Sequence, residues 1–229
     1  MLPMRRHAAR LSLAAATLLV SVSLPASASA KITEMGALGD SVAPGCPADC
    51  QAVTRVTAYQ AKVGPDRELY QAPADGRIVS WTIALGNPTP KDSGVFAQRY
   101  GKVPQAAVVV LDSAEKLSRT VVAKAPLQKL TPYLGTTVEF PLVHTLAIKK
   151  GQYVALTVPT WAPVMQVNLG ADTSWRSSRA ATGTGCLDTA TQFALLGKRT
   201  SAFFRCLYKG VRLTYSATFI SNPTATPTK

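Results

Sequence analysis

Two tryptophan-centred stretches carry side chains that could bind a ligand. Trp175, Arg176 and Arg179 lie in the segment SWRSSR, and Trp161 lies in VPTWAP between two prolines. An aromatic face can stack on a sugar ring or a base, and a nearby guanidinium complements an anion. If the two stretches meet at one end of the fold, they form an aromatic and cationic platform. The alternative is that both tryptophans fill the core, because Trp is usually largely buried.

For Trp161 the core position is the stronger prediction. It follows strand-like alternation over residues 152–158 and stands between Pro159 and Pro163. Because proline lacks the N–H that a ladder needs, we expect the pairing of this strand to end at Pro159. Trp161 would then close the core, and residues 175–179 are the better place to look for recognition.

Residues for acid–base catalysis are sparse. Apart from His7 near the N-terminus, the chain has one histidine, His144, and a lone histidine at a strand edge is usually structural. Glycoside hydrolysis needs two carboxylates that converge across a cleft, and no spacing pairs Asp112, Glu139, Asp172 or Asp188. The sequence has no G-x-S-x-G, no phosphate-binding loop and no cluster of metal ligands. It therefore favours a non-catalytic protein without metal or cofactor.

The segment ALGDSVAPG (residues 37–45) resembles the nucleophile block of GDSL-type esterases, with Ser41 in the position of the nucleophile. The resemblance implies an α/β fold and a histidine in an Asp-x-x-His block near the C-terminus. His144 lies in PLVHTL without that aspartate, and the chain shows almost no helical periodicity. A serine needs a base within hydrogen-bond reach to become a nucleophile. We therefore expect Ser41 to be a polar loop residue.

The four cysteines, Cys46, Cys50, Cys186 and Cys206, are an even number, and in an exported chain disulfides are the default. Three pairings can be drawn. Cys46 and Cys50 are separated by the turn-forming Pro-Ala-Asp, and Cys186 and Cys206 bracket a late segment, so locality favours 46–50 and 186–206. A zinc site is an alternative, but Cys-x3-Cys in an exported chain with one mature histidine is a poor match. A redox-active pair is another, but the Cys-x-x-Cys spacing is absent.

Residues 1–30 have the pattern of a secretory signal peptide. Three arginines precede a short apolar run over 11–22, and the small-residue site Ala-Ser-Ala ends at Ala30. We expect Lys31 to be the mature N-terminus, and the general export route fits better than the twin-arginine route. No later stretch of about 18 apolar residues follows, so no transmembrane segment is expected in the mature chain.

The charge balance is basic. The chain has 25 Lys and Arg against 12 Asp and Glu, a net charge of +13, and the loss of Arg5, Arg6 and Arg10 leaves +10. A positive surface favours anionic partners such as wall polymers or lipid headgroups. Nucleic acid is not an expected partner. Because the Lys and Arg are scattered and form no run longer than Lys149-Lys150, a basic but inert surface is the favoured interpretation.

Period-two alternation predicts strands throughout the chain. Residues 79–85, including Trp81, and residues 211–219 alternate strictly, and AAVVVL (106–111) is short and apolar enough for a fully buried strand. Further strand candidates are 52–59, 118–124, 136–142, 146–148, 152–158, 164–169 and 201–208. Gly or Pro punctuates nearly every gap between them. The pattern predicts an all-β, antiparallel two-sheet sandwich, jelly-roll-like.

The length fits one sandwich domain over residues 31–222, with a flexible tail at 223–229. Two connections, 87–104 and 171–200, are long for such a fold. Loops of this length are usually functional or disordered.

The segments DGRIVSWTI and KKGQYVALTVPTWAP, with CPADCQAVTRVTAY, SWRSSR and VRLTYSATFI, resemble a group of secreted β-sandwich proteins of actinobacteria over about residues 36–222. The resemblance implies export and the sandwich fold. The group has no assigned activity, so nothing about chemistry follows from it. At the level of fold alone, the pattern also resembles jelly-roll carbohydrate-binding modules.

The sequence therefore predicts a secreted, non-catalytic binding module for an anionic or sugar-containing polymer of the cell envelope. Its candidate binding residues are Trp175, Arg176, Arg179 and Trp161. A secreted hydrolase and a structural or protein-interaction domain are the alternatives.

Overall fold

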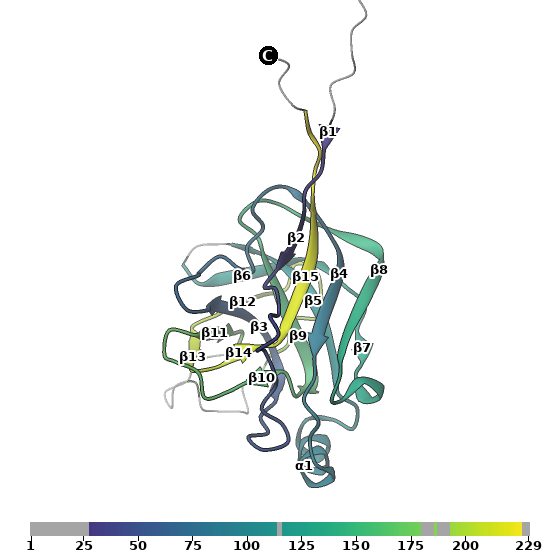
Figure 1. The fold of residues 1–229 in the computed structure, drawn as a ribbon, viewed down its shortest axis with the longest axis vertical. Coiled ribbons are helices and arrows are strands. Elements are labelled where there is room, and N and C mark those ends of the chain that lie inside the picture. Colours follow the sequence, from purple (N-terminus) through teal and green to yellow (C-terminus); the bar gives the residue numbers. More distant parts are fainter. Residues whose placement is uncertain (1–27, 114–115, 180–185, 187–192, 226–229) are drawn as a thin grey trace, which may run out of the picture.

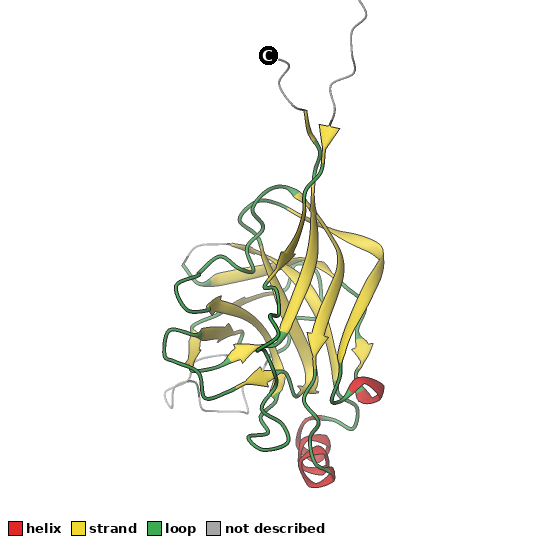
Figure 2. Ribbon diagram, viewed as in Figure 1, coloured by secondary structure: helices red, strands yellow, loops and turns green. Residues whose placement is uncertain are grey.

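The computed structural model describes residues 28–113, 116–179, 186 and 193–225. Two antiparallel sheets pack face to face in these residues, which confirms the predicted all-β sandwich (Figures 1 and 2). Every strand ladder in the described ranges is antiparallel. No helix in the described part of the chain is long and apolar enough to span a bilayer.

The larger sheet runs in the order β12-β6-β5-β9-β3-β11-β13, and β7 pairs with the start of β5. Its strands are β3 (Val53–Lys62), β5 (Gln105–Ser113), β6 (Ser118–Lys124), β7 (Gln128–Lys129), β9 (Tyr153–Ala162), β11 (Ser174–Ser177), β12 (Ser201–Phe203) and β13 (Cys206–Lys209). The short strand β13 is therefore one edge of this sheet.

The smaller sheet runs in the order β2-β15-β4-β8. Its strands are β2 (Ile32–Met35), β4 (Gly76–Ala84), β8 (Thr137–Ile148) and β15 (Tyr215–Ser221). Two short pairs complete the fold: β1 (Ala28–Ser29) with β16 (Thr224–Ala225), and β10 (Met165–Gln166) with β14 (Arg212–Leu213). A single 3-10 turn, η1 (Thr131–Tyr133), precedes β8.

The main core lies between the two sheets and includes Trp81, as its alternating strand predicts. The apolar run of β5 is buried on both faces. Val108 and Val110 point into the main core, whereas Val109 and Leu111 pack in a second cluster with Phe204. This second cluster explains why the run shows no alternation.

Pro159 does not end the pairing of β9, contrary to the sequence prediction. On the β5 side the ladder stops at Thr157, but on the β3 side it resumes at Thr54–Trp161 after a bulge. The bulged strand is β9, where Pro159 and Thr160 lie opposite the single residue Arg55 of β3. Arg55 has φ of 51°, a left-handed conformation that is unusual for a side-chain-bearing residue. Proline is tolerated in a sheet at such bulges, because the ladder there needs no N–H from it.

The region 87–104, expected to be a long loop, contains the helix α1 (Pro90–Tyr100). The side chain of Thr89 accepts a hydrogen bond from the Asp92 N–H at the N-cap, Pro90 occupies the first turn, and Gly101 follows the last. Each of these residues suits its helix position. No residue of α1 is buried, so the helix lacks the apolar stripe by which the sequence analysis searched for helices.

The other expected long loop, 171–200, contains β11, and residues 180–185 and 187–192 of it lie outside the described residues. At the termini, β1 and β16 run side by side away from the body (Figure 1), so Thr224 and Ala225 of the expected flexible tail are paired. Most of the expected signal peptide, residues 1–27, lies outside the described residues. Lys31, the expected mature N-terminus, is hydrogen-bonded to Ser221 through its backbone N–H and C=O.

Candidate functional site

A cavity of about 720 Å³ opens beside β13, where β10, β11, β13 and β14 gather at one side of the sandwich (Figure 1). We call it the edge cavity. It is lined by Gln51, Ala52, Val53, Thr54, Val56, Met165, Val167, Asn168, Leu169, Trp175, Arg179, Leu207, Tyr208, Lys209, Gly210 and Val211. Its volume falls within the range of about 300–1,000 Å³ that is typical of small-molecule sites.

Two aromatic rings form one wall of the edge cavity. Trp175 on β11 lies directly opposite Tyr208 on β13, so both side chains stand on the same face of the sheet. Their rings stack with centroids 4.4 Å apart and an interplanar angle of 21°. Trp175 is only 5% exposed and belongs to the main core. The indole therefore supports the cavity wall from behind and does not present a bare face to solvent.

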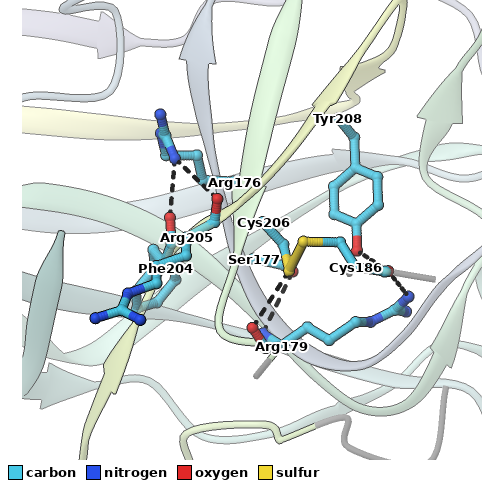
Figure 3. Close-up of a disulfide and its surroundings, with 8 residues drawn as sticks. All are labelled: Arg176, Ser177, Arg179, Cys186, Phe204, Arg205, Cys206 and Tyr208. Carbon is cyan, nitrogen blue, oxygen red and sulfur yellow. Dashed lines mark hydrogen bonds between the residues drawn. A yellow bond between two sulfur atoms is a disulfide. The ribbon is translucent and has the colours of Figure 1, made fainter. Parts of the chain in front are cut away.

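Arg179 is held beside this wall by the Cys186–Cys206 disulfide (Figure 3). Its Nη1 donates to the carbonyl oxygen of Cys186 at 2.8 Å, and the hydroxyl of Tyr208 donates to the same oxygen at 2.9 Å. The guanidinium carbon also lies 5.8 Å from the centroid of the Tyr208 ring. One carbonyl thus fixes the cation and the aromatic ring relative to each other.

The second disulfide, Cys46–Cys50, directly precedes the lining residues Gln51 and Ala52. Two hydrogen bonds tie its loop to the β10 region: Gly45 N–H donates to the carbonyl of Met165, and Asn168 Nδ2 donates to Asp49 Oδ2 at 2.9 Å. Both predicted pairings are confirmed, and each disulfide braces a wall of the cavity. A wall built this way is largely formed before a ligand arrives, which lowers the ordering cost of binding.

The charges on the edge cavity are of one sign. Arg179 and the exposed Lys209 line it, and no Asp or Glu occurs among its described lining residues. One carboxylate lies close to the lining: Asp49 accepts a hydrogen bond from the lining residue Asn168. The cavity is therefore suited to an anion.

The structure separates the other two predicted binding residues from this site. Arg176 points to the opposite face of the sheet, where its Nη1 donates to the carbonyls of Phe204 and Arg205 at 3.1 and 3.3 Å (Figure 3). Neither Arg176 nor Trp161 lines the edge cavity.

Trp161 is 2% exposed, packs against Phe96 of α1 with tilted rings and donates from Nε1 to the carbonyl of Gly101 at 3.0 Å. It is buried, as predicted, but it belongs to neither apolar cluster of the core and its ring contact is with α1. Along β3, Trp161 pairs with Thr54 whereas Trp175 pairs with Gln60, so the two tryptophans are about 20 Å apart along that strand. They do not form one platform.

Sequence reasoning missed Tyr208 and Lys209. The sequence offered part of the signal, because both residues follow Cys206 within the predicted strand 201–208 or directly after it. Only the register between β11 and β13, however, shows that Tyr208 faces Trp175.

The catalytic candidates lie elsewhere. Ser41 is exposed in a turn, and its carbonyl accepts from Gln166 Nε2. His144 is exposed on the edge strand β8 and lines a second, open cleft of about 1110 Å³ together with Asp75 and Asp112. Asp75 Oδ1 accepts the backbone N–H of Lys150 at 2.8 Å. Among the described residues, no group of three or more His, Cys, Asp or Glu could hold a metal ion, and all four cysteines are in disulfides.

The chain matches no protein-family profile, no curated protein and no solved structure. The resemblance to secreted actinobacterial proteins thus stays an expectation, and the functional argument depends on the geometry of the edge cavity.

Proposed function

We propose that this protein is an exported, non-catalytic β-sandwich module that binds an anionic or sugar-containing polymer of the cell envelope through the edge cavity. One observation carries the proposal. The cavity combines Arg179 and Lys209 with an aromatic wall and has no acidic residue among its described lining.

Export is the part of the proposal that explains the disulfides. Disulfide bonds form and persist in oxidising compartments outside the cytosol, and both disulfides here brace the cavity. Residues 1–30 would be the signal peptide that directs this export. The protein recovered from culture medium should begin at Lys31, which mass spectrometry of the intact chain would measure.

The test is a pull-down of the mature chain, with both disulfides intact, on insoluble cell-wall material at low and at high salt. Wild type should sediment with the wall at low salt and be released at high salt, because salt screens exposed charge pairs. Arg179→Ala and Lys209→Ala should weaken the binding. Their matched controls are Arg99→Ala on α1 and Lys129→Ala on β7, which remove the same charge from exposed positions outside the cavity.

Equal loss of binding in the controls would mean that net charge alone attracts the protein to the wall, and the edge cavity would not be the site. If wild type stays in the supernatant at low salt, the envelope-polymer function is wrong.

A hydrolase is the alternative that one observation favours, because His144, Asp75 and Asp112 line the same cleft. It requires turnover of wall glycan or of a chromogenic ester by wild type and its loss in His144→Ala. The binding function requires no turnover by either protein.

A further inference from the structure

We propose that the group held in the edge cavity is an amphipathic anion, namely an apolar chain that carries one carboxylate or phosphate head. The inference deepens the proposed function and rests on it, since it identifies the lipid-bearing end of an envelope polymer as the part that the module recognises. The apolar chain would lie between β10 and β13, and the head would meet Arg179 and Lys209.

The first support is the apolar character of the walls. Eight of the lining residues have apolar side chains: Ala52, Val53, Val56, Met165, Val167, Leu169, Leu207 and Val211. Of these, Leu207 pairs with Arg176 and so points to the other face of the sheet. Val53 and Val56 are both buried in the main core, although they are three residues apart, because the left-handed Arg55 between them, opposite the bulge of β9, returns β3 to the same face. The floor of the cavity is thus continuous with the core, and an apolar chain placed on it would be removed from water.

The second support is the position of the charges. Lys209 is exposed at the edge of β13, next in sequence to Tyr208, and Arg179 is fixed beside the same ring through Cys186 (Figure 3). Lys209 pairs with Ser174, so its side chain leaves β13 on the face opposite Tyr208, and Arg179 is the cation on the side of the ring. Both cations nevertheless line the cavity from its β11–β13 side, while the aliphatic residues of β3 and β10 line the rest. Charge at one wall and apolar surface at the others match a ligand with one head and one chain.

The third support is what the cavity lacks for a sugar ring. Recognition of hydroxyl groups needs several polar side chains, but the neutral ones here are Gln51, Thr54, Asn168, Trp175 and Tyr208. Of these, the amide nitrogen of Asn168 is bonded to Asp49 and the hydroxyl of Tyr208 to Cys186. A sugar ring also stacks on an open aromatic face. Trp175 is buried and its ring is stacked with Tyr208, so it offers no such face.

The experiment measures binding of decanoate and of decyl phosphate to the disulfide-intact mature chain by calorimetry, with both probes below their micelle concentration. Three further probes lack one of the two features: glucuronate and inorganic phosphate have no chain, and decyl maltoside has no charge. The two anionic amphiphiles should bind, and the other three should bind at least about tenfold more weakly, because each forgoes either the apolar burial or the charge-assisted contact. The ratio between decanoate and decyl phosphate distinguishes a carboxylate head from a phosphate head.

Two variants locate the site. Lys209→Glu reverses an exposed charge and Leu169→Glu places a carboxylate among the aliphatic residues, so each should weaken decanoate binding about tenfold or more. Lys129→Glu and Leu127→Glu make the same changes at exposed positions outside the cavity and should leave binding unchanged. Thermal unfolding of all four variants tests whether each is folded.

Each other outcome contradicts one stated claim: the ligand class, the location of the site, or the polymer function. If glucuronate or phosphate binds as tightly as the amphiphiles, the ligand class is wrong while envelope binding stands. If the amphiphiles bind equally to all four variants, the edge cavity is not their site. If neither amphiphile binds wild type, the inference fails, whatever the wall pull-down shows. If decanoate binds at the cavity but the wall does not, the polymer function fails and the amphiphile site remains.

Discussion

Trp175 and Tyr208 occupy directly opposed positions of the β11–β13 ladder and stack with ring centroids 4.4 Å apart. Through this pair the main core is joined to the Cys186–Cys206 disulfide, because the Tyr208 hydroxyl donates to the carbonyl of Cys186. The edge strand β13 has a neighbouring strand on one side only, and this side-chain contact adds to the ladder that β13 forms with β11. The contact also sets the wall on which the candidate site depends.

Replacement of Tyr208 should separate these two roles. Tyr208→Phe keeps the stack on Trp175 and removes one hydrogen bond, so it should lower the free energy of unfolding by about 0.5–1.5 kcal/mol. Tyr208→Ala also removes the ring and should cost about 2–4 kcal/mol in total. Urea denaturation of both variants measures the difference.

The Phe variant serves as the control for the Ala variant, since only the latter loses the ring. Equal costs would show that the stack contributes nothing to stability and that the hydroxyl alone holds β13.

Much of the sandwich could be predicted from the sequence because apolar residues within single strands show the pattern typical of a strand. The alternation around Trp81 and the apolar run 106–111 fall within β4 and β5. Helix α1 was not predicted, because its stabilising features are a cap and a first-turn proline, whereas the sequence was searched for an apolar stripe. The prediction that pairing ends at Pro159 was wrong, because whether a proline ends a strand depends on a bulge that only the pairing with the neighbouring strand reveals.

The candidate site was only half predictable. Trp175 and Arg179 were named from residue type, and the structure places both on one cavity. Arg176 is their neighbour in sequence, but the alternation of β11 sends it to the other face. Tyr208 was missed because it lies 33 positions away from Trp175, and register across an edge strand cannot be read from either segment alone.

The two most buried tryptophans should respond differently to the same substitution. Trp161 Nε1 donates to the carbonyl of Gly101, whereas Trp81 Nε1 is buried with no hydrogen-bond partner in the part of the chain that the structure describes. Both changes to Phe remove ring volume, but only Trp161→Phe leaves a carbonyl without its donor. Trp161→Phe should therefore be more destabilising by about 1–2 kcal/mol.

Chemical denaturation gives this difference, with Trp81→Phe as the matched control. Amide exchange adds an independent readout, because Gly101 ends α1 and the helix should exchange faster in Trp161→Phe only. A greater loss in Trp81→Phe would mean that packing, and not the Gly101 hydrogen bond, decides the outcome.

The two disulfides should contribute unequally. Cys46 and Cys50 close a ring with a sequence separation of 4, and Cys186 and Cys206 one of 20. Loop-closure entropy then predicts losses of about 2 kcal/mol for Cys46→Ser/Cys50→Ser and about 3 kcal/mol for Cys186→Ser/Cys206→Ser. The second variant should also lose more decanoate affinity, since the Cys186 carbonyl that positions Arg179 and Tyr208 is no longer tethered. The opposite order of affinities would contradict the positioning role of Cys186.

Two buried tyrosines should make the protein less stable in alkali. Burial raises the pKa of Tyr70, and burial together with neighbouring Tyr70 raises the pKa of Tyr215 well above the ordinary value. Their rings contact each other, and the Tyr70 hydroxyl donates to the Tyr215 carbonyl at 2.6 Å. Below the unfolded pKa of about 10 both phenols are neutral in either state and the native arrangement keeps its full stability.

Above that pH the unfolded chain releases these protons and the native chain holds them, so the free energy of unfolding should fall as pH rises toward the raised pKa values. The variant Tyr70→Phe isolates the contribution of Tyr70 to this slope. Tyr70→Phe should be less stable than wild type near neutral pH, because it loses the hydrogen bond to Tyr215. Its free energy of unfolding should nevertheless fall less steeply between about pH 9 and pH 11, because one of the two native-state protons is absent. Urea denaturation across this range measures both slopes, and parallel curves would show that Tyr70 ionises as readily in the folded chain as in the unfolded one.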